Sequence, residues 1–153
     1  ALATMGAGLP SAMAARLVYP DRPVVAVVGD GGLLMNGQEM ETVVRLGLRL
    51  VVLVLRDDGY GMIRWKQEEM GLPDYGLSFG NPDFPAWARS YGANGYRIDH
   101  PDELGVVLSE ALEAPGVHLL EVPVSYAEDH RVLNEEITES ARKVALAQAP
   151  PSS

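Results

Sequence analysis

Two aspartates stand beside glycines at points where apolar segments of the chain end. Asp30 is flanked by glycines and follows the apolar run 24–28, and Asp57 lies shortly after the apolar run 50–55. Carboxylate oxygens are ligands that Mg²⁺ and Ca²⁺ prefer, and glycines let backbone N–H groups approach a phosphate closely. These two segments are therefore predicted to hold one metal ion and one phosphate group between them.

The elements around the two aspartates explain how they could meet. Both apolar runs are continuous rather than alternating, which is typical of strands buried on both faces of a parallel sheet. Between them, residues 36–46 have apolar side chains at helical spacing, and Gly47 fits a C-terminal cap. A strand–helix–strand unit with a right-handed crossover places both carboxylates at the carboxyl edge of one sheet, where open α/β folds bind ligands.

Either turn by itself would be weak support for a site, because Gly-Asp-Gly and Asp-Asp-Gly are common turn sequences. Their position at the ends of two successive strands favours a shared metal and phosphate site over two ordinary turns. A dinucleotide-binding loop is another interpretation of residues 29–32, but the G-x-G-x-x-G spacing is absent there.

The rest of the chain fits an α/β domain with an open, mainly parallel sheet and helices on both faces. Further helices are predicted over 11–19, 60–70 (in part), 83–91, 101–114 and 135–148, and further strands over 95–98 and 117–124. We expect the domain to span 1–126, with a helical extension over 127–148 and a disordered tail over 149–153.

Three finer expectations concern burial and loops. The side chains of helix 101–114 that we expect to face the sheet are Val106, Val107, Leu108 and Leu112. The strand over 117–124 should be buried apart from Glu121. Residues 71–82, which contain glycines and prolines, should form a loop long enough to cover a site.

The motifs together resemble those of the thiamine-diphosphate enzymes, most of all the large, catalytic subunit of the acetolactate synthases. Gly29-Asp30-Gly31, 24 residues and then Arg56-Asp57 are similar to the family signature G-D-G, a spacer and N-N, although Arg-Asp replaces the usual Asn-Asn. The stretches A-T-M-G-A-G-L-P (3–10), G-Y-G-M (59–62) and Y-G-L-S-F-G-N-P-D (75–83) extend the resemblance. It covers residues 1–126 and implies the family's diphosphate-binding domain without its first strand and helix.

The resemblance implies roles for individual residues. Mg²⁺ would bind the side chains of Asp30 and Asp57 and the backbone carbonyl of Gly59. Thiamine diphosphate would contact Ala3, Thr4, Met5, Gly31, Gly32, Tyr60, Gly61 and Met62. Met5 would support the bent cofactor from below and the Ala3 carbonyl would accept a hydrogen bond from its 4′-amino group, whereas without the resemblance Met5 is interpreted as a core residue. The substrate pocket would include Ile63, Trp65 and Lys66.

The implied activity is a transferase reaction of branched-chain amino acid biosynthesis. A 2-oxo acid such as pyruvate would lose carbon dioxide, and the remaining fragment would be joined to a second 2-oxo acid. Trp65 matches the aromatic position of the catabolic acetolactate synthases. Two alternatives stay open: a 2-oxo-acid decarboxylase of the benzoylformate or indolepyruvate type or a related carboligase, and a non-catalytic interaction domain.

No residue of this chain matches the glutamate that starts the chemistry in the family. That glutamate comes from a pyrimidine-binding domain of a partner subunit, and a middle domain of the family is a place where FAD could bind. We therefore expect a fragment that is inactive by itself, and an intact homo-oligomer, dimer or tetramer, whose site is shared between subunits.

Composition excludes several classes of partner. The 153 residues carry a net charge of −9, which gives no electrostatic reason to bind nucleic acid or an anionic membrane. The absence of cysteine excludes disulfides, thiol catalysis and thiolate metal sites. No apolar stretch is long enough to span a bilayer, and a cytoplasmic location is expected.

Overall fold

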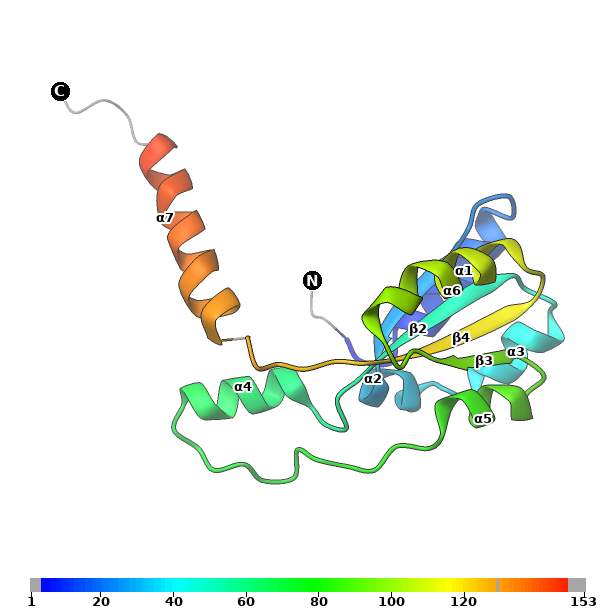
Figure 1. Cartoon of the computed structure of the whole chain (residues 1–153), viewed down its shortest axis with the longest axis horizontal. Helices are drawn as coiled ribbons and strands as arrows, with labels where there is room; N and C mark the ends of the chain where they lie inside the picture. Colours follow the sequence, from blue (N-terminus) through cyan, green and yellow to red (C-terminus); the bar gives the residue numbers. More distant parts are fainter. Residues whose placement is uncertain (1–3, 129, 149–153) are drawn as a thin grey trace.

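Four parallel strands form one open sheet in the computed structural model, which describes residues 4–128 and 130–148 (Figure 1). The strands are β1 (Val25–Gly29), β2 (Leu50–Arg56), β3 (Asn94–Arg97) and β4 (Val117–Pro123), in the spatial order β1-β2-β4-β3. All three pairings are parallel. The predicted open α/β sheet is confirmed, and in the described residues it is wholly parallel.

Helices cover the two faces of the sheet unequally. Four helices pack on one face, namely α1 (Gly8–Val18), α2 (Asp30–Met35), α3 (Glu39–Arg45) and α5 (Phe84–Ser90). Their apolar side chains join Val52 and Val54 of β2 in the larger core cluster. The other face has α6 (Pro101–Glu113), which packs on Val51 and Leu120. The sheet therefore has one thick apolar layer and one thinner layer.

Expectations about burial are wrong for β1 and for α6. β2 is buried on both faces, but β1 alternates, with Val25 38% and Val27 59% exposed, because α6 packs on β2 and β4 and leaves this face of β1 open. On α6, Val106 is 60% exposed, and Leu104 takes part in the apolar contact with the sheet instead.

The helix predicted over 36–46 is present in a shorter form, as α3, and a separate helix that was not predicted, α2, precedes it. α2 begins at Asp30, directly after β1, and α3 follows after a break at residues 36–38. At the break, the Asn36 amide donates to the Gly6 carbonyl oxygen at 2.9 Å. Gly31 and Gly32 have a low helix propensity, so the sequence favoured a turn here. Packing of α2 against the sheet overrides this preference.

The segment after β2 forms α4 (Gly61–Glu69) and then a long loop that returns to α5. The loop is tied to the turn before α4 by two backbone hydrogen bonds, Tyr60 N–H to Leu77 O at 2.9 Å and Phe79 N–H to Asp58 O at 3.1 Å. Leu77 is buried. The predicted loop over 71–82 thus lies beside the second aspartate turn rather than extending freely.

The last part of the chain stands apart from the sheet. A π-helical segment, η1 (His130–Glu136), leads into α7 (Ile137–Gln148), and Figure 1 shows α7 projecting away from the other helices. A helix thus occupies much of the predicted extension over 127–148, while the domain boundaries stay a prediction. The predicted tail over 149–153 lies outside the described residues. None of the helices within the described ranges is long and apolar enough to cross a membrane.

Gly95 of β3 provides a test of the packing between α5 and the sheet. A Cβ at this position would lie 2.3 Å from the backbone oxygen of Pro85, so Gly95→Ala should destabilise the fold by about 1–3 kcal/mol. Gly105 is the matched control, because a Cβ there meets no atom within 4 Å and Gly105→Ala in a helix interior should stabilise by about 1 kcal/mol. The unfolding temperatures of the two variants should move in opposite directions. Equal unfolding temperatures would contradict the close contact between Gly95 and the Pro85 backbone.

Candidate functional site

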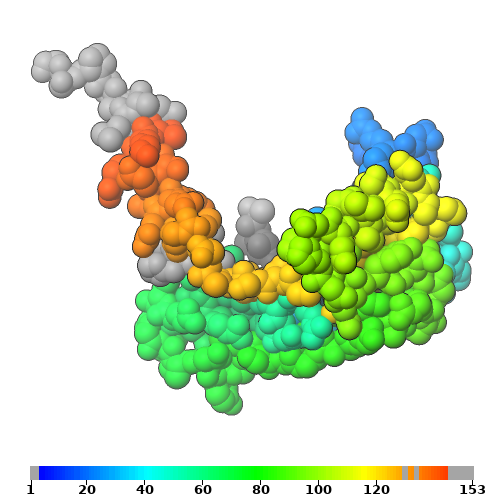
Figure 2. All heavy atoms as spheres, viewed as in Figure 1, coloured from blue at the N-terminus to red at the C-terminus, as the bar shows by residue number. Residues whose placement is uncertain are grey.

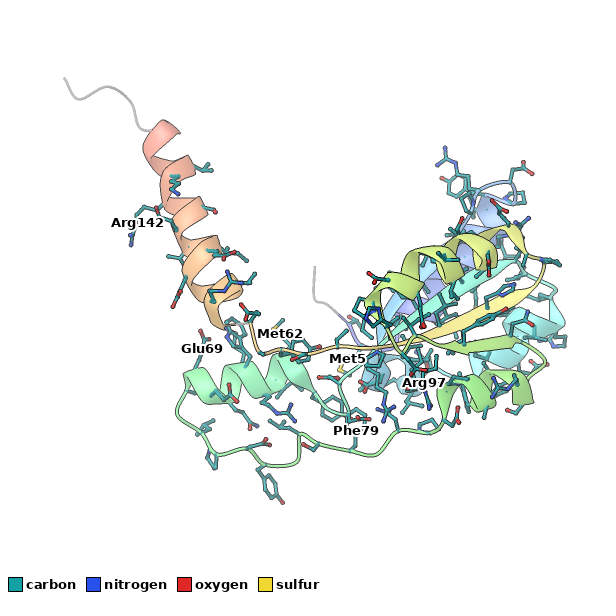
Figure 3. The ribbon with its side chains drawn as sticks, in the orientation of Figure 1. Met5, Met62, Glu69, Phe79, Arg97 and Arg142 are labelled. Atoms are coloured by element: carbon teal, nitrogen blue, oxygen red, sulfur yellow. The ribbon has the colours of Figure 1, made fainter. Side chains whose placement is uncertain are left out.

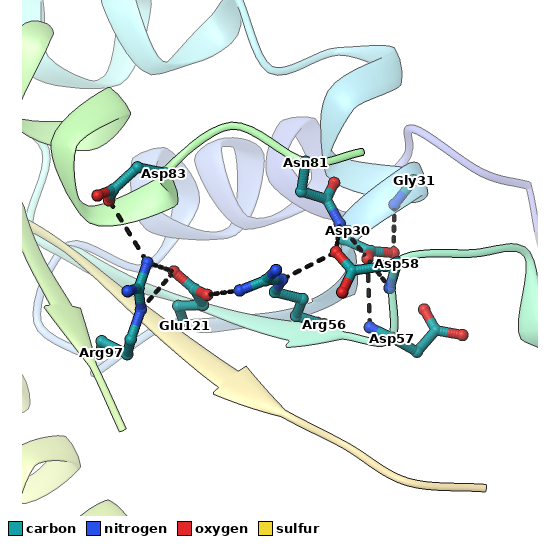
Figure 4. A network of polar contacts seen from close by, with 9 residues as sticks. All are labelled: Asp30, Gly31, Arg56, Asp57, Asp58, Asn81, Asp83, Arg97 and Glu121. Atoms are coloured by element: carbon teal, nitrogen blue, oxygen red, sulfur yellow. Dashed lines mark hydrogen bonds and ion pairs between the residues drawn. The ribbon is translucent and has the colours of Figure 1, made fainter. Parts of the chain in front are cut away.

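The carboxylate of Asp30 joins the ends of β1 and β2 (Figure 4). Asp30 is 1% exposed, and its Oδ1 accepts a hydrogen bond from the Gly31 N–H at 2.7 Å. Its Oδ2 accepts the backbone N–H groups of Asp57 at 3.2 Å and Asp58 at 2.9 Å. The two aspartate turns predicted to share a site are therefore in direct contact.

Asp57 has a carboxylate oxygen that lacks a protein partner. Its Oδ2 is buried and makes no hydrogen bond within the described residues. Burial, and next the negative charge of Asp30, raise the pKa of Asp57 above its usual value. A buried oxygen with no donor is costly, and a cation would satisfy it. The pair of carboxylates thus fits a metal ion that neither carboxylate could hold alone.

A cavity of about 390 Å³ opens beside this pair. Its lining includes these predicted residues: Thr4, Met5, Gly31, Gly32, Asp57, Gly59, Tyr60, Gly61, Met62 and Ile63. In Figure 3, Met5 comes from the N-terminal segment near α2 and Met62 from the start of α4. The structure thus brings most of the predicted cofactor residues around one space.

Other predicted residues lie elsewhere. Asp30 is not in the lining of the cavity, although its neighbour Gly31 is, and Ala3 lies outside the described residues. Trp65 and Lys66 are on α4 but do not line the cavity; the Lys66 ammonium lies 3.9 Å from the centre of the Trp65 ring. Their role in a substrate pocket stays a prediction.

Gly6 and Gly8, from the stretch 3–10, also line the cavity, and so does Tyr126, which the sequence analysis did not indicate. Tyr126 follows β4, and a Cβ on Gly61 would lie 2.7 Å from its ring and 2.9 Å from Asp57 Oδ2. Figure 2 shows the segment after β4 (yellow to orange) on the floor of a broad hollow between α6 and α7. Only the folded chain places Tyr126 in the cavity lining, since no motif surrounds it in the sequence.

Two aromatic rings explain why position 31 is a glycine. The rings of Tyr60 and Phe79 lie 4.8 Å apart, and a Cβ on Gly31 would come within 2.9 Å of the first and 3.1 Å of the second. Gly31 is therefore required by packing as well as by its place in the cavity lining.

A chain of charged side chains extends from the Asp57 turn across the sheet (Figure 4). Arg56 pairs with Asp58 at 2.9 Å and with Glu121 of β4 at 2.7 Å, and Arg97 of β3 pairs with the other oxygen of Glu121 at 3.2 Å. Glu121 was expected to be the exposed exception in its strand, and this is wrong: it is 0% exposed, because two arginines compensate its charge. Arg56, and next the amide of Asn81, lower the pKa of Asp58.

The side chains alone do not complete a metal site. Within the described ranges, no three side chains of His, Cys, Asp or Glu are placed to share one ion. An ion between Asp30 and Asp57 would need backbone oxygen and a ligand such as phosphate, which is how Mg²⁺ is commonly bound.

A known protein family matches most of this chain. Residues 1–122 match the family described as "Thiamine pyrophosphate enzyme, C-terminal TPP binding domain". This chain belongs to the thiamine pyrophosphate enzymes. Thiamine pyrophosphate is another name for thiamine diphosphate, so the family resemblance inferred from the sequence is confirmed.

Relatives of this thiamine pyrophosphate domain include acetolactate synthases. The acetolactate synthase of Bacillus subtilis (strain 168) is 37% identical over 88% of this chain and 24% of its own length. The acetolactate synthase large subunit of Parasynechococcus marenigrum (strain WH8102) is 36% identical over 97% of this chain and 25% of its own length. The chain thus spans about a quarter of the length of these relatives.

A solved structure has the same fold as this thiamine pyrophosphate domain. The thiamine diphosphate-dependent 4-hydroxybenzoylformate decarboxylase of Rhodococcus jostii RHA1 superposes with a TM-score of 0.77 and 27% identity. The match covers 81% of this chain and 24% of that one.

The two aspartates should respond differently to substitution in the absence of metal and cofactor. Asp30→Ala removes the acceptor of three backbone N–H groups, each costing about 1–3 kcal/mol when left buried and unpaired. Asp57→Asn should leave the unfolding temperature unchanged or higher, because burial and Asp30 already disfavour the charged carboxylate. Thermal unfolding of the intact protein measures both; a larger loss in Asp57→Asn would contradict this assignment.

Proposed function

We propose that this domain binds the diphosphate of thiamine diphosphate through a Mg²⁺ ion held between Asp30 and Asp57. The buried Asp57 Oδ2, which has no hydrogen-bond partner in the part of the chain that the structure describes, carries this proposal. Within the described residues, Asp30 Oδ1 accepts one hydrogen bond, so it retains a lone pair for the ion. The Gly59 carbonyl oxygen would be a further ligand. Two carboxylates and a diphosphate form the oxygen-rich set that suits Mg²⁺.

The cavity lining supports a ligand with a polar end and an apolar end. Glycines at 31, 32 and 61 line the cavity without side chains of their own, which lets a diphosphate approach the backbone closely. Met5, Met62 and Ile63 supply an apolar wall for the rings of the cofactor. When bound, thiamine diphosphate supplies the electron sink that allows a 2-oxo acid to lose carbon dioxide.

For the intact protein, we propose an acetolactate synthase-like reaction that joins two 2-oxo acids. The two relatives described above, which align with most of this chain, are both named acetolactate synthases. Among the described residues that line the cavity, Asp57 is the only carboxylate, and it is assigned to the metal. The activating glutamate is therefore proposed to come from another domain or subunit, in a homo-oligomer whose site is shared, and this chain alone is proposed to be inactive. Binding of FAD elsewhere, a place in branched-chain amino acid biosynthesis and a cytoplasmic location stay predictions.

A 2-oxo-acid decarboxylase is the second candidate. The solved decarboxylase shares the fold at 27% identity, and both reactions begin with the loss of carbon dioxide. The fate of the remaining fragment separates the two: a second 2-oxo acid gives a longer hydroxy acid, whereas a proton gives an aldehyde.

Titration of the intact protein with thiamine diphosphate should show binding that depends on Mg²⁺. Pyruvate should then give carbon dioxide and acetolactate; carbon dioxide with acetaldehyde alone would favour the decarboxylase. Binding that is unchanged after removal of divalent ions with a chelator would contradict the metal assignment, whatever the product.

Gly32 tests whether the cavity holds the diphosphate. It lines the cavity, and a Cβ there would meet no protein atom within 4 Å, so Gly32→Ala should fold normally. The added methyl group would occupy part of the cavity that the diphosphate is proposed to fill. One clash of this kind costs about 1–3 kcal/mol, so thiamine diphosphate should bind about tenfold more weakly or worse. Gly105→Ala, on a helix distant from the cavity lining, is the control and should bind normally. Normal binding by both variants would place the diphosphate elsewhere.

A further inference from the structure

Asp58 is a third aspartate at the same turn, yet it does not line the cavity. It has a φ of 55°, and among the described residues it is the only non-glycine residue with a positive φ. Aspartate and asparagine adopt this left-handed conformation more readily than other non-glycine residues. Its Oδ1 accepts hydrogen bonds from Arg56 Nε at 2.9 Å and Asn81 Nδ2 at 2.8 Å. The carboxylate next to Asp57 in the sequence is thus held by two side chains of its own.

Arg56 is fixed at both ends of its guanidinium group. While Nε binds Asp58, Nη1 donates to the fully buried Glu121 at 2.7 Å. A buried carboxylate strongly favours a cation that stays in place, because its charge would otherwise be uncompensated. Arg97 binds the other carboxylate oxygen of Glu121, so Arg56 has only the first oxygen to bind. Figure 4 shows the guanidinium between Glu121 and Asp58.

Asn81 forms a second connection at the same place. Its Nδ2 donates to Asp30 Oδ2 at 2.6 Å and to Asp58 Oδ1 at 2.8 Å. The amide therefore separates two carboxylates that would repel each other, and it directs Asp58 toward Arg56. Arg56 and Asn81 hold Asp58 from two directions.

The charges of the three aspartates explain why the position of Asp58 matters for a metal ion. Asp30, Asp57 and Asp58 together carry three negative charges when ionised, and a divalent ion balances two of them. A diphosphate adds further negative charge. If Asp58 were free to turn toward the ion, it would occupy a coordination position and repel the diphosphate.

We propose that Arg56 is a positioning residue that keeps Asp58 away from the metal ion and neutralises it, so that the ion keeps open positions for a diphosphate. This rests on the proposed binding of thiamine diphosphate through Mg²⁺. Arg56 stands where the family signature usually has asparagine, and Asp58 is one of the two carboxylates that it pairs with, the other being Glu121. Arg56 acts through Asp58 and does not touch the ligand.

Arg56→Met should separate two affinities that a general loss of structure would lower together. Mn²⁺ is the probe, and its binding to the intact protein can be followed by electron paramagnetic resonance. With Asp58 released, bare Mn²⁺ should bind as tightly as before or several-fold more tightly, because a further carboxylate becomes available. Binding of thiamine diphosphate in the presence of saturating Mn²⁺ should become about tenfold weaker, because a like charge faces the diphosphate.

The double variant Arg56→Met/Asp58→Asn decides the matter. Asparagine at position 58 keeps the left-handed conformation and removes the charge. Both affinities should therefore return to within about twofold of those of the unmodified protein. Such recovery is how a double-mutant cycle reveals that two residues are coupled. Asp83→Asn is the control: Asp83 pairs with Arg97 at 3.7 Å at the far end of the same network and caps α5, a position where asparagine serves equally well. It should change neither affinity.

Two outcomes overturn the inference. One is a fall of both affinities together in Arg56→Met, and the other is a double variant as impaired as Arg56→Met alone; either would make Arg56 a purely structural residue. Failure of the proposed function looks different, because the unmodified protein would then bind thiamine diphosphate equally well with and without Mn²⁺. Unfolding temperatures of all variants, measured without metal, show whether the loop is still folded.

Discussion

One buried carboxylate, that of Asp30, determines how the ends of β1 and β2 are arranged. It accepts backbone N–H groups from its own helix and from the turn after β2, and it also accepts the amide of Asn81 from the long loop. Three segments that are distant in the sequence thus converge on two oxygens. Charge-assisted hydrogen bonds of this kind are roughly twice as strong as neutral ones, so the turns that surround the cavity are fixed before any ligand arrives.

The carboxyl edge of the sheet carries charges that alternate in sign from strand to strand. In spatial order, the residues are Asp30 after β1, Arg56 at the end of β2, Glu121 in β4 and Arg97 at the end of β3. Parallel strands bring these ends to one edge, where like charges on neighbouring strands would repel. Alternation lets this edge of the sheet carry several ionised groups while the neighbouring charges compensate one another.

The sequence predicts the elements better than it predicts their partners. β2 and β4 were predicted within one residue of their observed ends, because long apolar runs reflect burial on both faces. The two aspartate turns were placed correctly at one edge because parallel topology requires it. The link from Arg56 to Glu121 spans 65 residues, and no local pattern reports it. A lone acidic residue in an apolar strand was the available signal, since a buried carboxylate needs a cation. The open face of β1 and the position of Asn81 depend on which segments pack together, which periodicity does not show.

The open side of β1 has a practical consequence for work with this chain. Among the described strands, β1 has a neighbour on one side only, and its exposed valines add apolar surface next to the unpaired backbone groups. Such an edge is a template for strands of other molecules. An edge strand of this kind, with exposed valines beside it, favours association between copies of this chain through β1.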